Sequence, residues 1–598
     1  MADAQSRADA VFEISWEVCN KVGGIHTVLR SKVPAMLNAY AGKRYILIGP
    51  WNARAGGEFE ERPTPADMIS VLDAARNAGI PAVYGVWRVA GEPSVILVDF
   101  RSLFARANDL KRRYWERFGI DALGARYDYD EPLCFATAAG IFIEQYAQQH
   151  PGRIIAHAHE WMAGFAILHL RAANANVATV FTTHATILGR SIMGSGQDLY
   201  ALIDLPGFDA RAHAYRLGVQ EKHLTETACA KEADAFTTVS DITAREATRI
   251  LERVPDEVTY NGFHVDRFPT FEETSVRHEA TRDLLRDLTA AMCFPEAPFD
   301  LENTVLIVTS GRYEMRNKGL DVIIRALAQI NERLRKEGSK RTIVMLFFVI
   351  RDRGPLRQDV LERWSAYQRI RSAVDWEGKR ILRRVALDLF AGKTPGGDDL
   401  FTSGIIEGLR ESAAEVTHSG QAPIATHHIT DETHDPILVA CKAAGLHNGA
   451  EDRVKVLFLP GMFDGADGLL NLPYYDALVG AHLGLFPSAY EPWGYTPLES
   501  AILGVPTITT DAAGFGQYAR ATAAQHDTGV IVLPRLGVGD DAFTRHLAES
   551  LLWFIGLDHA ERVTHGFSAK RIAESCNWTY FIPRYLRAHE CALAKRGR

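Results

Sequence analysis

The sequence predicts an α/β protein made of two doubly wound halves. Short apolar runs of strand length alternate with amphipathic stretches of helix length, first over residues 11–265 and again over residues 304–510. This alternation is typical of parallel sheets that carry helices on both faces. Glycine-containing loops follow several of the apolar runs, and α/β folds bind ligands at such strand ends. We therefore expect two parallel sheets with ligand-binding loops at their carboxyl edges.

Composition limits the classes of protein to which the chain can belong. Of its 598 residues, 47% are hydrophobic and 23% are charged, an ordinary globular composition for several domains or two large ones. A net charge of −8 without a basic block argues against nucleic acid as a partner. Seven scattered cysteines without a Cys-x-x-Cys pair favour reduced thiols. The apolar runs are far shorter than the ~20 residues of a membrane span, so we expect a soluble cytoplasmic protein with no membrane partner.

The first half opens with a predicted strand over residues 11–15. The strand leads into Lys21, Gly23 and Gly24, and a helical pattern begins at Ile25. Adjacent glycines let backbone N–H groups approach a ligand closely, and the start of a helix favours an anion. A plain tight turn is the alternative interpretation of the glycines, and Lys21 is equally ambiguous.

Histidines close two later strands of this half. His157 and His159 end one strand and Glu160 follows them, whereas His184 ends the next strand. The spacing His-x-His-Glu suits a metal site on a helix poorly, so we expect hydrogen-bonded histidines at a strand end and no metal. His184 is either a histidine satisfied at the sheet edge or a contact to substrate, because α/β folds bind ligands at this edge.

The second half opens with a predicted strand over residues 304–308. A loop with Arg312 and Lys318 follows, and an amphipathic helix begins at Leu320. Arginine offers a planar fork to phosphate oxygens and lysine offers a point charge. Solvated surface charge is the alternative, but the position at a strand end favours phosphate binding. Tyr474, at the start of a later short helix, either stacks on a nucleobase or packs in the core.

The stretch Glu491–Glu499, with the sequence EPWGYTPLE, is the densest group of polar and aromatic residues at a strand end. Thr496 as N-cap, Pro497 as first helical residue and Glu499 as capping-box partner would explain its second part without any function. Glu491 has no such local role. We expect it to contact a ligand.

These groups together match the needs of a metal-independent nucleotide-sugar transferase. Arg312, Lys318 and the helix start at Thr496 can hold a diphosphate. Tyr474 can hold a base, and Glu491 can hold sugar hydroxyls. Cations and a helix dipole would then stabilise the leaving diphosphate without a metal.

Longer motifs run in a fixed order along nearly the whole chain. They are Trp16–Ile25, His157–Trp161, Thr182–Thr186 with Gly189 and Arg190, Phe236–Ser240, Asn261 with Gly262, Gly311–Glu314 with Asn317–Gly319, Asp435–Leu438, Glu451–Val456 and Glu491–Glu499. By these motifs the chain resembles eukaryotic-type glycogen synthase, glycosyltransferase family 3. The resemblance implies two Rossmann-like domains facing a cleft, an arrangement called GT-B. It also implies retaining transfer of glucose from UDP-glucose to the non-reducing 4-hydroxyl of an α-1,4-glucan, with no cofactor.

The resemblance also implies roles for residues on the donor side. Arg312 and Lys318 would bind the diphosphate, and Tyr474 would stack on uracil. Tyr495 and Thr496 would offer backbone N–H groups to phosphate.

On the sugar side, Glu491 would hold the glucose and stabilise positive charge near its C1. Glu499 would contact the ribose or support the loop. His184, Arg190 and Glu160 would complete the sugar and acceptor side. Gly23 and Gly24, beside Lys21, would form the loop that faces the phosphate.

The expected domains follow from the same resemblance. They are an acceptor-side domain over residues 1–268, a nucleotide-sugar domain over residues 300–574, a C-terminal helix over residues 575–598 that packs back on the first domain, and a helical insertion over residues 351–440. The insertion is a candidate oligomerisation element, since the family implies a homo-tetramer. The expected partners are a nucleotide sugar and glycogen or maltodextrin.

Two other functions stay open at this point, and one family feature looks absent. The alternatives are a related retaining glucosyltransferase that makes a small oligosaccharide and a non-catalytic glucan-binding protein. The eukaryotic proteins use an arginine-rich helix for activation by glucose 6-phosphate. The matching residues 561–576 have only Arg562, Lys570 and Arg571 as cations, so we do not expect that activation.

Overall fold

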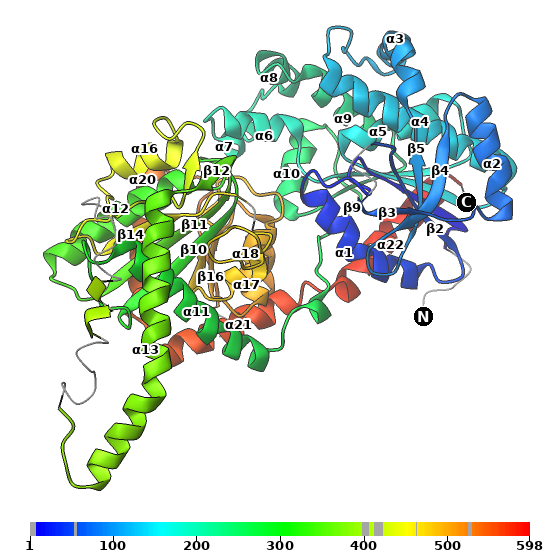
Figure 1. Ribbon diagram of the computed structural model, residues 1–598. Helices are drawn as coiled ribbons and strands as arrows, with labels where there is room; N and C mark the ends of the chain where they lie inside the picture. The colour runs from blue at the N-terminus through cyan, green and yellow to red at the C-terminus, as the bar shows by residue number, and fades with distance from the viewer. Residues whose placement is uncertain are drawn as a thin grey trace.

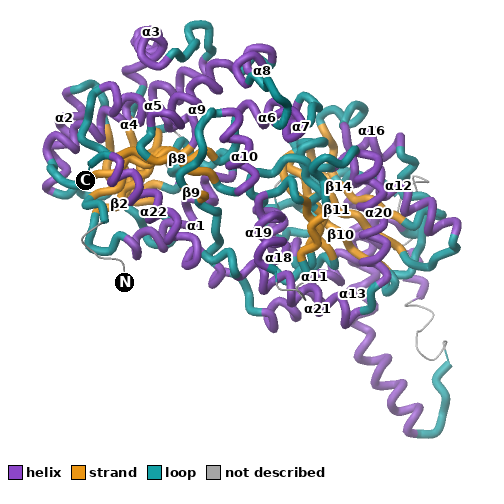
Figure 2. Tube along the Cα trace, turned by 180° about the vertical axis from the view of Figure 1, so that it is seen from behind, coloured by secondary structure: helices purple, strands orange, loops and turns teal. Residues whose placement is uncertain are grey.

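The structure is a computed structural model that describes residues 7–52, 57–396, 406–408, 410–411, 422–461, 463–523 and 529–597. These residues form two α/β lobes, and each lobe has one large sheet between helices (Figure 1, Figure 2). The fold class expected from the sequence is confirmed.

The N-terminal lobe is built on a nine-stranded sheet with the strand order β3-β4-β5-β2-β1-β6-β7-β8-β9. Its strands are β1 Ala10–Ile14, β2 Arg44–Pro50, β3 Phe59–Glu61, β4 Ala82–Trp87, β5 Ser94–Val98, β6 Ile154–His159, β7 Ala178–Thr183, β8 Ala235–Thr238 and β9 Glu257–Val258. The β3–β4 and β4–β5 pairs are antiparallel, and the other pairs of this sheet are parallel. β1, β6 and β7 are buried along their whole length, as expected for parallel strands covered on both faces.

Helices cover both faces of this sheet (Figure 2). They are α1 Gly24–Ala39, α2 Ala66–Asn77, α3 Ala107–Phe118, α4 Tyr127–Gln149, α5 Glu160–Ala172, α6 Ile187–Gly194, α7 Leu199–Ile203, α8 Ala210–Arg216, α9 Gln220–Glu232 and α10 Asp241–Ile250, with the 3₁₀ turns η2 Arg101–Arg106 and η3 Val265–Arg267. α5 and α6 begin directly after β6 and β7, so the ends of those strands and the starts of those helices lie at one edge of the sheet.

The C-terminal lobe is built on a six-stranded parallel sheet with the order β14-β11-β10-β15-β16-β17. Its strands are β10 Thr304–Arg312, β11 Thr342–Ile350, β14 Val454–Phe458, β15 Leu483–Leu485, β16 Thr507–Thr510 and β17 Val530–Leu533. Its helices are α11 Phe271–Cys293, α12 Leu320–Lys336, α16 Pro436–Ala443, α17 Tyr474–Leu478, α18 Tyr495–Ile502, α19 Gly514–Thr522, α20 Asp540–Gly556 and α21 His559–Glu574. β10 lies at the centre, between β11 and β15, so the loops after β10 and β15 are neighbours.

The chain crosses between the lobes twice, and the two crossings are hydrogen-bonded to each other. Phe263 donates its N–H to the carbonyl of Cys576 at 2.8 Å, and Trp578 donates its N–H to the carbonyl of Phe263 at 3.2 Å. The last helix, α22 Trp578–Lys595, then returns to the N-terminal lobe (Figure 1). There the hydroxyl of Tyr40 lies 2.6 Å from Nδ1 of His589. The C-terminal helix therefore closes the core of the first lobe.

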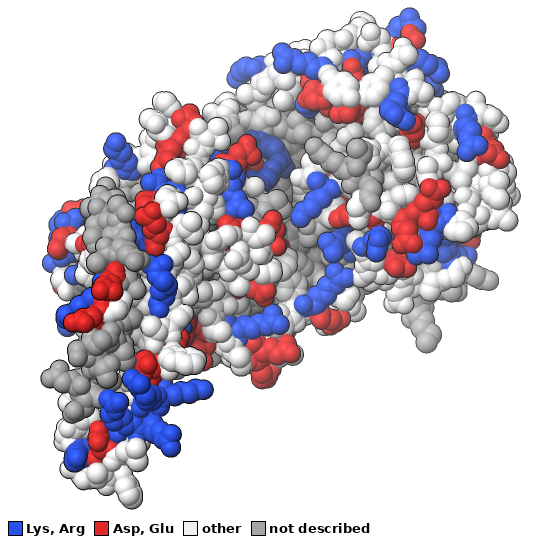
Figure 3. All heavy atoms as spheres, in the orientation of Figure 1, with Lys and Arg blue, Asp and Glu red and all other residues white. Residues whose placement is uncertain are grey.

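A long helix, α13 Gln358–Phe390, projects from the C-terminal lobe as an arm (Figure 1). It belongs to the expected insertion at residues 351–440, which also contributes a small antiparallel pair, β12 Arg353–Leu356 with β13 His427–Ile429. Residues 397–405, 409 and 412–421 of the insertion lie outside the described part of the chain. Basic side chains gather near the end of the arm (Figure 3). Among the helices that the structure describes, none combines the length and apolar character of a membrane span.

Candidate active site

A cavity of about 700 Å³ lies between the lobes, at the carboxyl ends of the C-terminal strands. The C-terminal lobe contributes Ser310, Gly311, Tyr474, Tyr475, Thr496 and Glu499. The N-terminal lobe contributes Lys21, His26, Thr27 and Arg30 from the start of α1 and its preceding loop, and the linker contributes Phe263 and His264. The volume is in the range of small-molecule and cofactor sites. Lys21, Tyr474, Thr496 and Glu499 were all selected from the sequence.

Tyr474 is held in this cavity by its hydroxyl group. That oxygen lies 2.7 Å from Oγ of Ser310, while the adjacent Tyr475 donates to Oε1 of Glu499 at 3.0 Å. Burial raises the pKa of Glu499 to about 7, although the two tyrosines and the charge of Lys318 act in the opposite direction. The ring of Tyr474 is therefore fixed at the cavity wall, where a planar base could lie against it.

The predicted capping box is wrong. α18 begins at Tyr495, its N-cap is Gly494 with a φ of 108°, and no side chain caps it. Glu499 bonds Tyr475 instead of its own helix start. Among the described residues, no group accepts the N–H of Tyr495 or Thr496. The first turn of α18 thus offers free donors beside the cavity, which suits an anion.

Glu491 and Lys318 form an ion pair at the two adjacent strand ends, after β15 and β10. Their side chains are only 14% and 12% exposed. The backbone of Glu491 is fixed because its N–H donates to the carbonyl of Ala512 at 3.2 Å. The pair therefore brings a carboxylate and an ammonium group together at the carboxyl edge of the C-terminal sheet.

Arg312 lies at the end of β10, one residue beyond the cavity-lining Gly311. Its guanidinium is half exposed and its Nη1 lies 3.0 Å from Oε1 of Glu314. This pair is accessible to solvent, so a phosphate can compete for the guanidinium.

Arg190, on α6 of the N-terminal lobe, is half-buried and lies within electrostatic range of Tyr490 and Glu491 of the C-terminal lobe. Burial lowers the pKa of its guanidinium, but Tyr490 and the carboxylates of Glu160, Glu314 and Glu491 raise it more. The arginine is therefore a permanent cation that lies close to carboxylates from both lobes.

His184 and Glu160 are coupled through the backbone. Glu160 accepts the N–H groups of His184 at 2.9 Å and Ala185 at 3.1 Å, and burial raises its pKa to about 7. Its own φ of 66° lies in the left-handed region, a strained conformation for a residue other than glycine. Glu160 thus positions the loop that carries His184 rather than projecting freely into the cleft.

The glycine pair at the start of α1 is already occupied by a side chain. Gly23 donates its N–H to Oε2 of Glu17 at 2.7 Å, and His26 donates to the same oxygen at 2.9 Å. A phosphate would have to displace Glu17 to reach the N–H of Gly23, and the role of Gly23 and Gly24 as a phosphate-facing loop stays a prediction. Gly24 begins the helix, and Lys21 is exposed at the cavity edge.

Direct contacts join the lobes on both sides of Glu491 in the sequence. The hydroxyl of Tyr490 donates to Oε1 of Glu246 at 2.9 Å, and Ser240 Oγ donates to the carbonyl of Pro492. Glu246 also accepts the N–H of Thr186 at 3.0 Å, two residues after His184. One carboxylate thus binds both the loop of His184 and the segment of Glu491.

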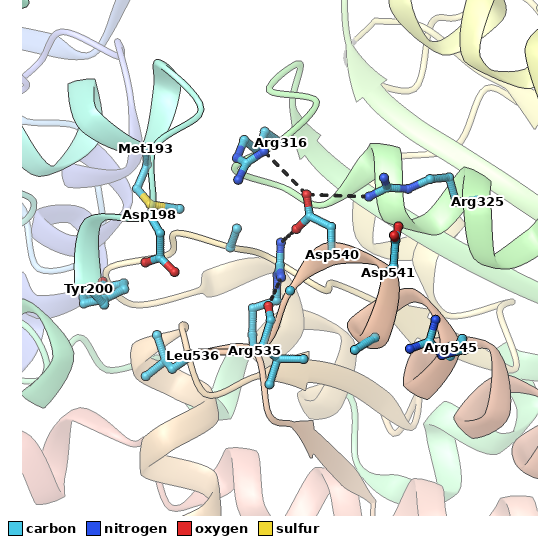
Figure 4. A pocket seen from close by; sticks show the side chains of 14 residues that line it. Met193, Asp198, Tyr200, Arg316, Arg325, Arg535, Leu536, Asp540, Asp541 and Arg545 are labelled. Atoms are coloured by element: carbon cyan, nitrogen blue, oxygen red, sulfur yellow. Dashed lines mark hydrogen bonds and ion pairs between the residues drawn. The ribbon is translucent and has the colours of Figure 1, made fainter. Parts of the chain in front are cut away.

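A second cavity, of about 630 Å³, lies where the loop before Glu491 meets α6 and α7 (Figure 4). Its N-terminal wall is Met193, Asp198 and Tyr200, and its C-terminal wall includes Arg316, Arg325, Arg535, Asp540 and Arg545. Three arginines share one carboxylate, because Asp540 lies 3.5 Å from Arg316, 3.9 Å from Arg325 and in an ion pair with Arg535. The wall is rich in hydrogen-bond donors.

Several residues around the site are not predicted from the sequence. Glu246 reads as an ordinary helix residue, and Tyr490 reads as part of an apolar strand end. Glu13 and Lys32, which form a buried ion pair below His184, gave a usable signal, since each is a charge inside an otherwise apolar strand or helix face. Such charges are rarely buried unless they are paired.

The expectation of too few cations rests on the cations of residues 561–576 alone. In the structure, Arg562 lines a cavity of about 890 Å³ together with Arg282, Arg286 and Arg341. Burial and the neighbouring charges of Arg286 and Arg562 lower the pKa of Arg282 to about 10. α11 therefore supplies cations that the C-terminal helix lacks.

The fold and the site together define a class. Two Rossmann-like lobes that face one another across a cleft, with cations and helix starts at the strand ends, constitute a GT-B glycosyltransferase. Comparison with known sequences gives the family: the sequence model described as glycogen synthase matches residues 13–596. The chain belongs to the glycogen synthase family. The resemblance seen in the sequence motifs, and the expectation of an enzyme, are confirmed.

Relatives support this assignment over nearly the full chain. It is 33% identical over 593 residues to glycogen [starch] synthase of Neurospora crassa, covering 98% of this chain and 84% of the relative. It is 30% identical over 589 residues to the liver glycogen [starch] synthase of Rattus norvegicus, covering 98% and 83%. The solved N-terminal domain of a Candida albicans trehalose-6-phosphate phosphatase matches with a TM-score of 0.50 at 12% identity, over 97% of each chain. This last likeness concerns the fold alone.

Proposed function

We propose that the chain transfers glucose from UDP-glucose to the non-reducing 4-hydroxyl of an α-1,4-glucan, with retention of configuration at C1. The observation that carries this proposal is the Lys318–Glu491 ion pair at the strand ends, with Arg190 of the N-terminal lobe within electrostatic range of Glu491. A carboxylate and an ammonium group paired at adjacent strand ends suit a reaction in which a sugar becomes positive while a diphosphate leaves. The choice of uridine rests on the resemblance to the family.

The cavity of about 700 Å³ is the proposed nucleotide site. Tyr474 would lie against the base, and Glu499 would accept from the ribose. The free N–H groups of Tyr495 and Thr496, with Arg312, would bind the diphosphate, because unpaired helix-start donors and a guanidinium fork both fit phosphate oxygens.

In the proposed reaction, the bond between C1 of glucose and the diphosphate oxygen breaks while a bond from C1 to the acceptor 4-oxygen forms on the same face. The acceptor proton passes to a diphosphate oxygen, so no separate base is required. Lys318, Arg312 and Arg190 stabilise the charge on the leaving diphosphate, and Glu491 stabilises the positive charge that develops at C1.

The proposed acceptor path runs past the second cavity, beside Ala489 and α6 (Figure 4). Its wall of arginines and aspartates offers many hydrogen-bond partners for glucan hydroxyls. Asp198 and Arg535 stand on opposite walls of this cavity, one on each lobe.

The test is release of UDP or ADP from the two glucose donors, measured in parallel with glycogen present. Glycogen-dependent UDP release with incorporation of labelled glucose into polymer supports the proposal. Label found in a disaccharide instead of polymer would favour the oligosaccharide-forming alternative. Absence of nucleotide release with either donor would leave only a glucan-binding role.

We also propose that the α13 arm joins copies of this chain. Its described surface carries Trp376 at 84% exposure and Phe390 at 95%, with Leu382, Leu387 and Leu389 also exposed. Large apolar side chains at this exposure mark an interaction surface, and the family resemblance names a second copy as the occupant. Light scattering should show a tetramer for the intact chain and smaller species for Trp376→Asp/Phe390→Asp.

A further inference from the structure

A chain of hydrogen bonds leads from the core of the N-terminal lobe to the cleft. Oε1 of Glu13, the penultimate residue of β1, lies 2.5 Å from Nε2 of His159 at the end of β6. Nδ1 of His159 lies 2.9 Å from Nε2 of His184 at the end of β7. All three side chains are buried, and β1, β6 and β7 are neighbours in the sheet, so the pleat holds them in line.

Glu13 is ionised and acts only as an acceptor. Although burial opposes its ionisation, the Lys32 ammonium and the hydrogen bond from His159 hold the pKa of this carboxyl well below its ordinary value. Lys32 pairs with Oε1, and the hydroxyl of Tyr45 donates to Oε2. A carboxylate in this state has no proton to give, so His159 must donate to it through Nε2–H.

The ionised state of Glu13 determines which ring nitrogens of His159 and His184 carry a proton. Burial, with the positive charge of Lys32, lowers the pKa of His159 and of His184, so both imidazoles are neutral and each carries one N–H. His159 uses its single N–H on Glu13, which leaves its Nδ1 as an acceptor. His184 must therefore donate through Nε2–H, and its Nδ1 has no proton. In the described part of the chain, nothing donates to that Nδ1.

We propose that Glu13 is a positioning residue that acts through His159 to hold His184 in the tautomer whose Nδ1 accepts a hydrogen bond from a substrate hydroxyl. This inference rests on the proposed function in one respect, namely that His184 faces the transferred glucose. It assigns His184 the recognition of a hydroxyl group. It excludes His184 as a proton donor to the leaving diphosphate or to the acceptor oxygen.

A metal is a poorer explanation of the same cluster. The ligand atoms of Glu13, His157 and His159 lie within 4.8 Å of one another. However, the Lys32 ammonium is already paired with Oε1 of Glu13, and a cation at this carboxylate repels a metal ion. His157 is bonded through both ring nitrogens, to His589 at 3.1 Å and Thr182 at 2.7 Å. That second branch leads away from His184.

The branch to His589 provides a matched control. Tyr40→Phe removes one hydrogen bond to His589 in the same buried core without touching the chain to His184. The informative variant is Glu13→Met/Lys32→Met/Tyr45→Phe. It removes the carboxylate and two of its donors together, so that no charge stays unpaired in the core, and such replacements of buried ion pairs are often tolerated. Glu13→Gln is the conservative variant, because its amide oxygen can still accept from His159.

Two measurements test the proposal. In ¹⁵N NMR of histidine-labelled protein without substrate, with His184→Ala to assign the signal, His184 should have a bare Nδ1 in the wild type, in Glu13→Gln and in Tyr40→Phe. The triple variant should lose that single tautomer. A protonated Nδ1 in the wild type would overturn the proposal, whatever the substrate of the enzyme proves to be.

The second measurement is the rate with glucose donors that each lack one hydroxyl. The wild type should discriminate roughly 10-fold against one of them, the scale of a lost hydrogen bond that leaves a polar group unpaired. The triple variant should lose this discrimination, and Glu13→Gln and Tyr40→Phe should keep it. A triple variant that is slower but discriminates unchanged would show a merely structural role. Absence of transfer from every glucose donor would refute the proposed function, while the NMR result would still stand.

Discussion

Lys318 and Glu491 are 173 residues apart in the sequence and form a buried ion pair across two adjacent parallel strand ends. β10 and β15 are neighbours in the sheet, although β11, the α13 arm and β14 separate them along the chain. The pair is the point at which the proposed nucleotide site meets the proposed sugar site.

Replacement of Glu491 should abolish most activity. Glu491→Gln keeps the shape but removes the negative charge near C1, so kcat should fall at least ~100-fold, the scale of one lost transition-state stabiliser. The measurement is nucleotide release with glycogen present. Glu332→Gln, in an exposed ion pair on α12, serves as the control and should be unchanged. Near-normal turnover of Glu491→Gln would mean that the site is misplaced.

Arg312 tests the diphosphate contact separately. Arg312→Ala should lower kcat/KM for the donor at least ~100-fold, and Arg312→Lys should recover only part of it, since a lysine lacks the planar fork. Arg333→Ala, exposed on α12, is the matched control. Equal activity of the alanine and wild-type enzymes would remove Arg312 from the phosphate site.

The raised pKa of Glu499 predicts that the stability of the protein depends on pH. Burial raises its pKa from 4.5 to about 7, so the folded state favours the protonated form. The resulting stabilisation is complete below about pH 4.5 and is lost as the pH rises through 7. The free energy of unfolding of the wild type should therefore fall relative to Glu499→Gln by up to about 3 kcal/mol over this window. Denaturant titrations at pH 5 and pH 8 measure the difference, and parallel curves for the two proteins would contradict the prediction.

Gly514 tests the contact between the lobes. A Cβ at this position would lie 2.3 Å from the carbonyl oxygen of Pro492 and 2.6 Å from Cβ of Ser240. Gly514→Ala should push the segments of Pro492 and Ser240 apart and destabilise the protein by about 1–3 kcal/mol. It should also lower kcat, because Glu491 directly precedes Pro492 and would move with it. Gly556→Ala, where a Cβ meets nothing within 4 Å, is the control. Thermal melting and turnover should change together only in the first variant.

The cavity lined by Arg282, Arg286, Arg341 and Arg562 should bind a phosphorylated sugar. An anion would relieve the repulsion that lowers the pKa of Arg282. Glucose 6-phosphate should raise the melting temperature of the wild type and change its activity, and Arg282→Ala should respond much less. Glucose without phosphate is the control ligand. An equal response of both proteins to glucose 6-phosphate would place its site elsewhere.

The sequence was sufficient to predict the elements that depend on periodic patterns. The strands before Lys21, His184 and Glu491 are where the alternation of apolar runs placed them, because burial on both faces leaves a plain signal. The strand expected over residues 304–308 continues to Arg312, so this arginine ends β10 and does not lie in the loop that follows. Lys21, Tyr474, Thr496 and Glu499 then share one cavity, as residues at strand ends should.

What the sequence did not show depends on contacts between distant segments. The capping box at Thr496 failed because Gly494 adopts a left-handed conformation and starts the helix earlier. The engagement of Gly23 by Glu17, and the Tyr490–Glu246 bond, each need a three-dimensional neighbour that no local spacing reveals.

The two paired crossings at Phe263 and Asn577 determine how a rotation of the lobes affects the two cavities between them. Two hydrogen-bonded crossings act as a hinge between the lobes. When the lobes rotate about it, residues far from the crossings move more than residues near them. Phe263 and His264, at one of the crossings, line the proposed nucleotide cavity. Among the described residues that line the second cavity, none belongs to either crossing. A swing of the lobes would therefore widen the glucan entrance while the nucleotide compartment changes little. In the proposed reaction, such a movement would let a glucan leave and return while the nucleotide sugar stays bound.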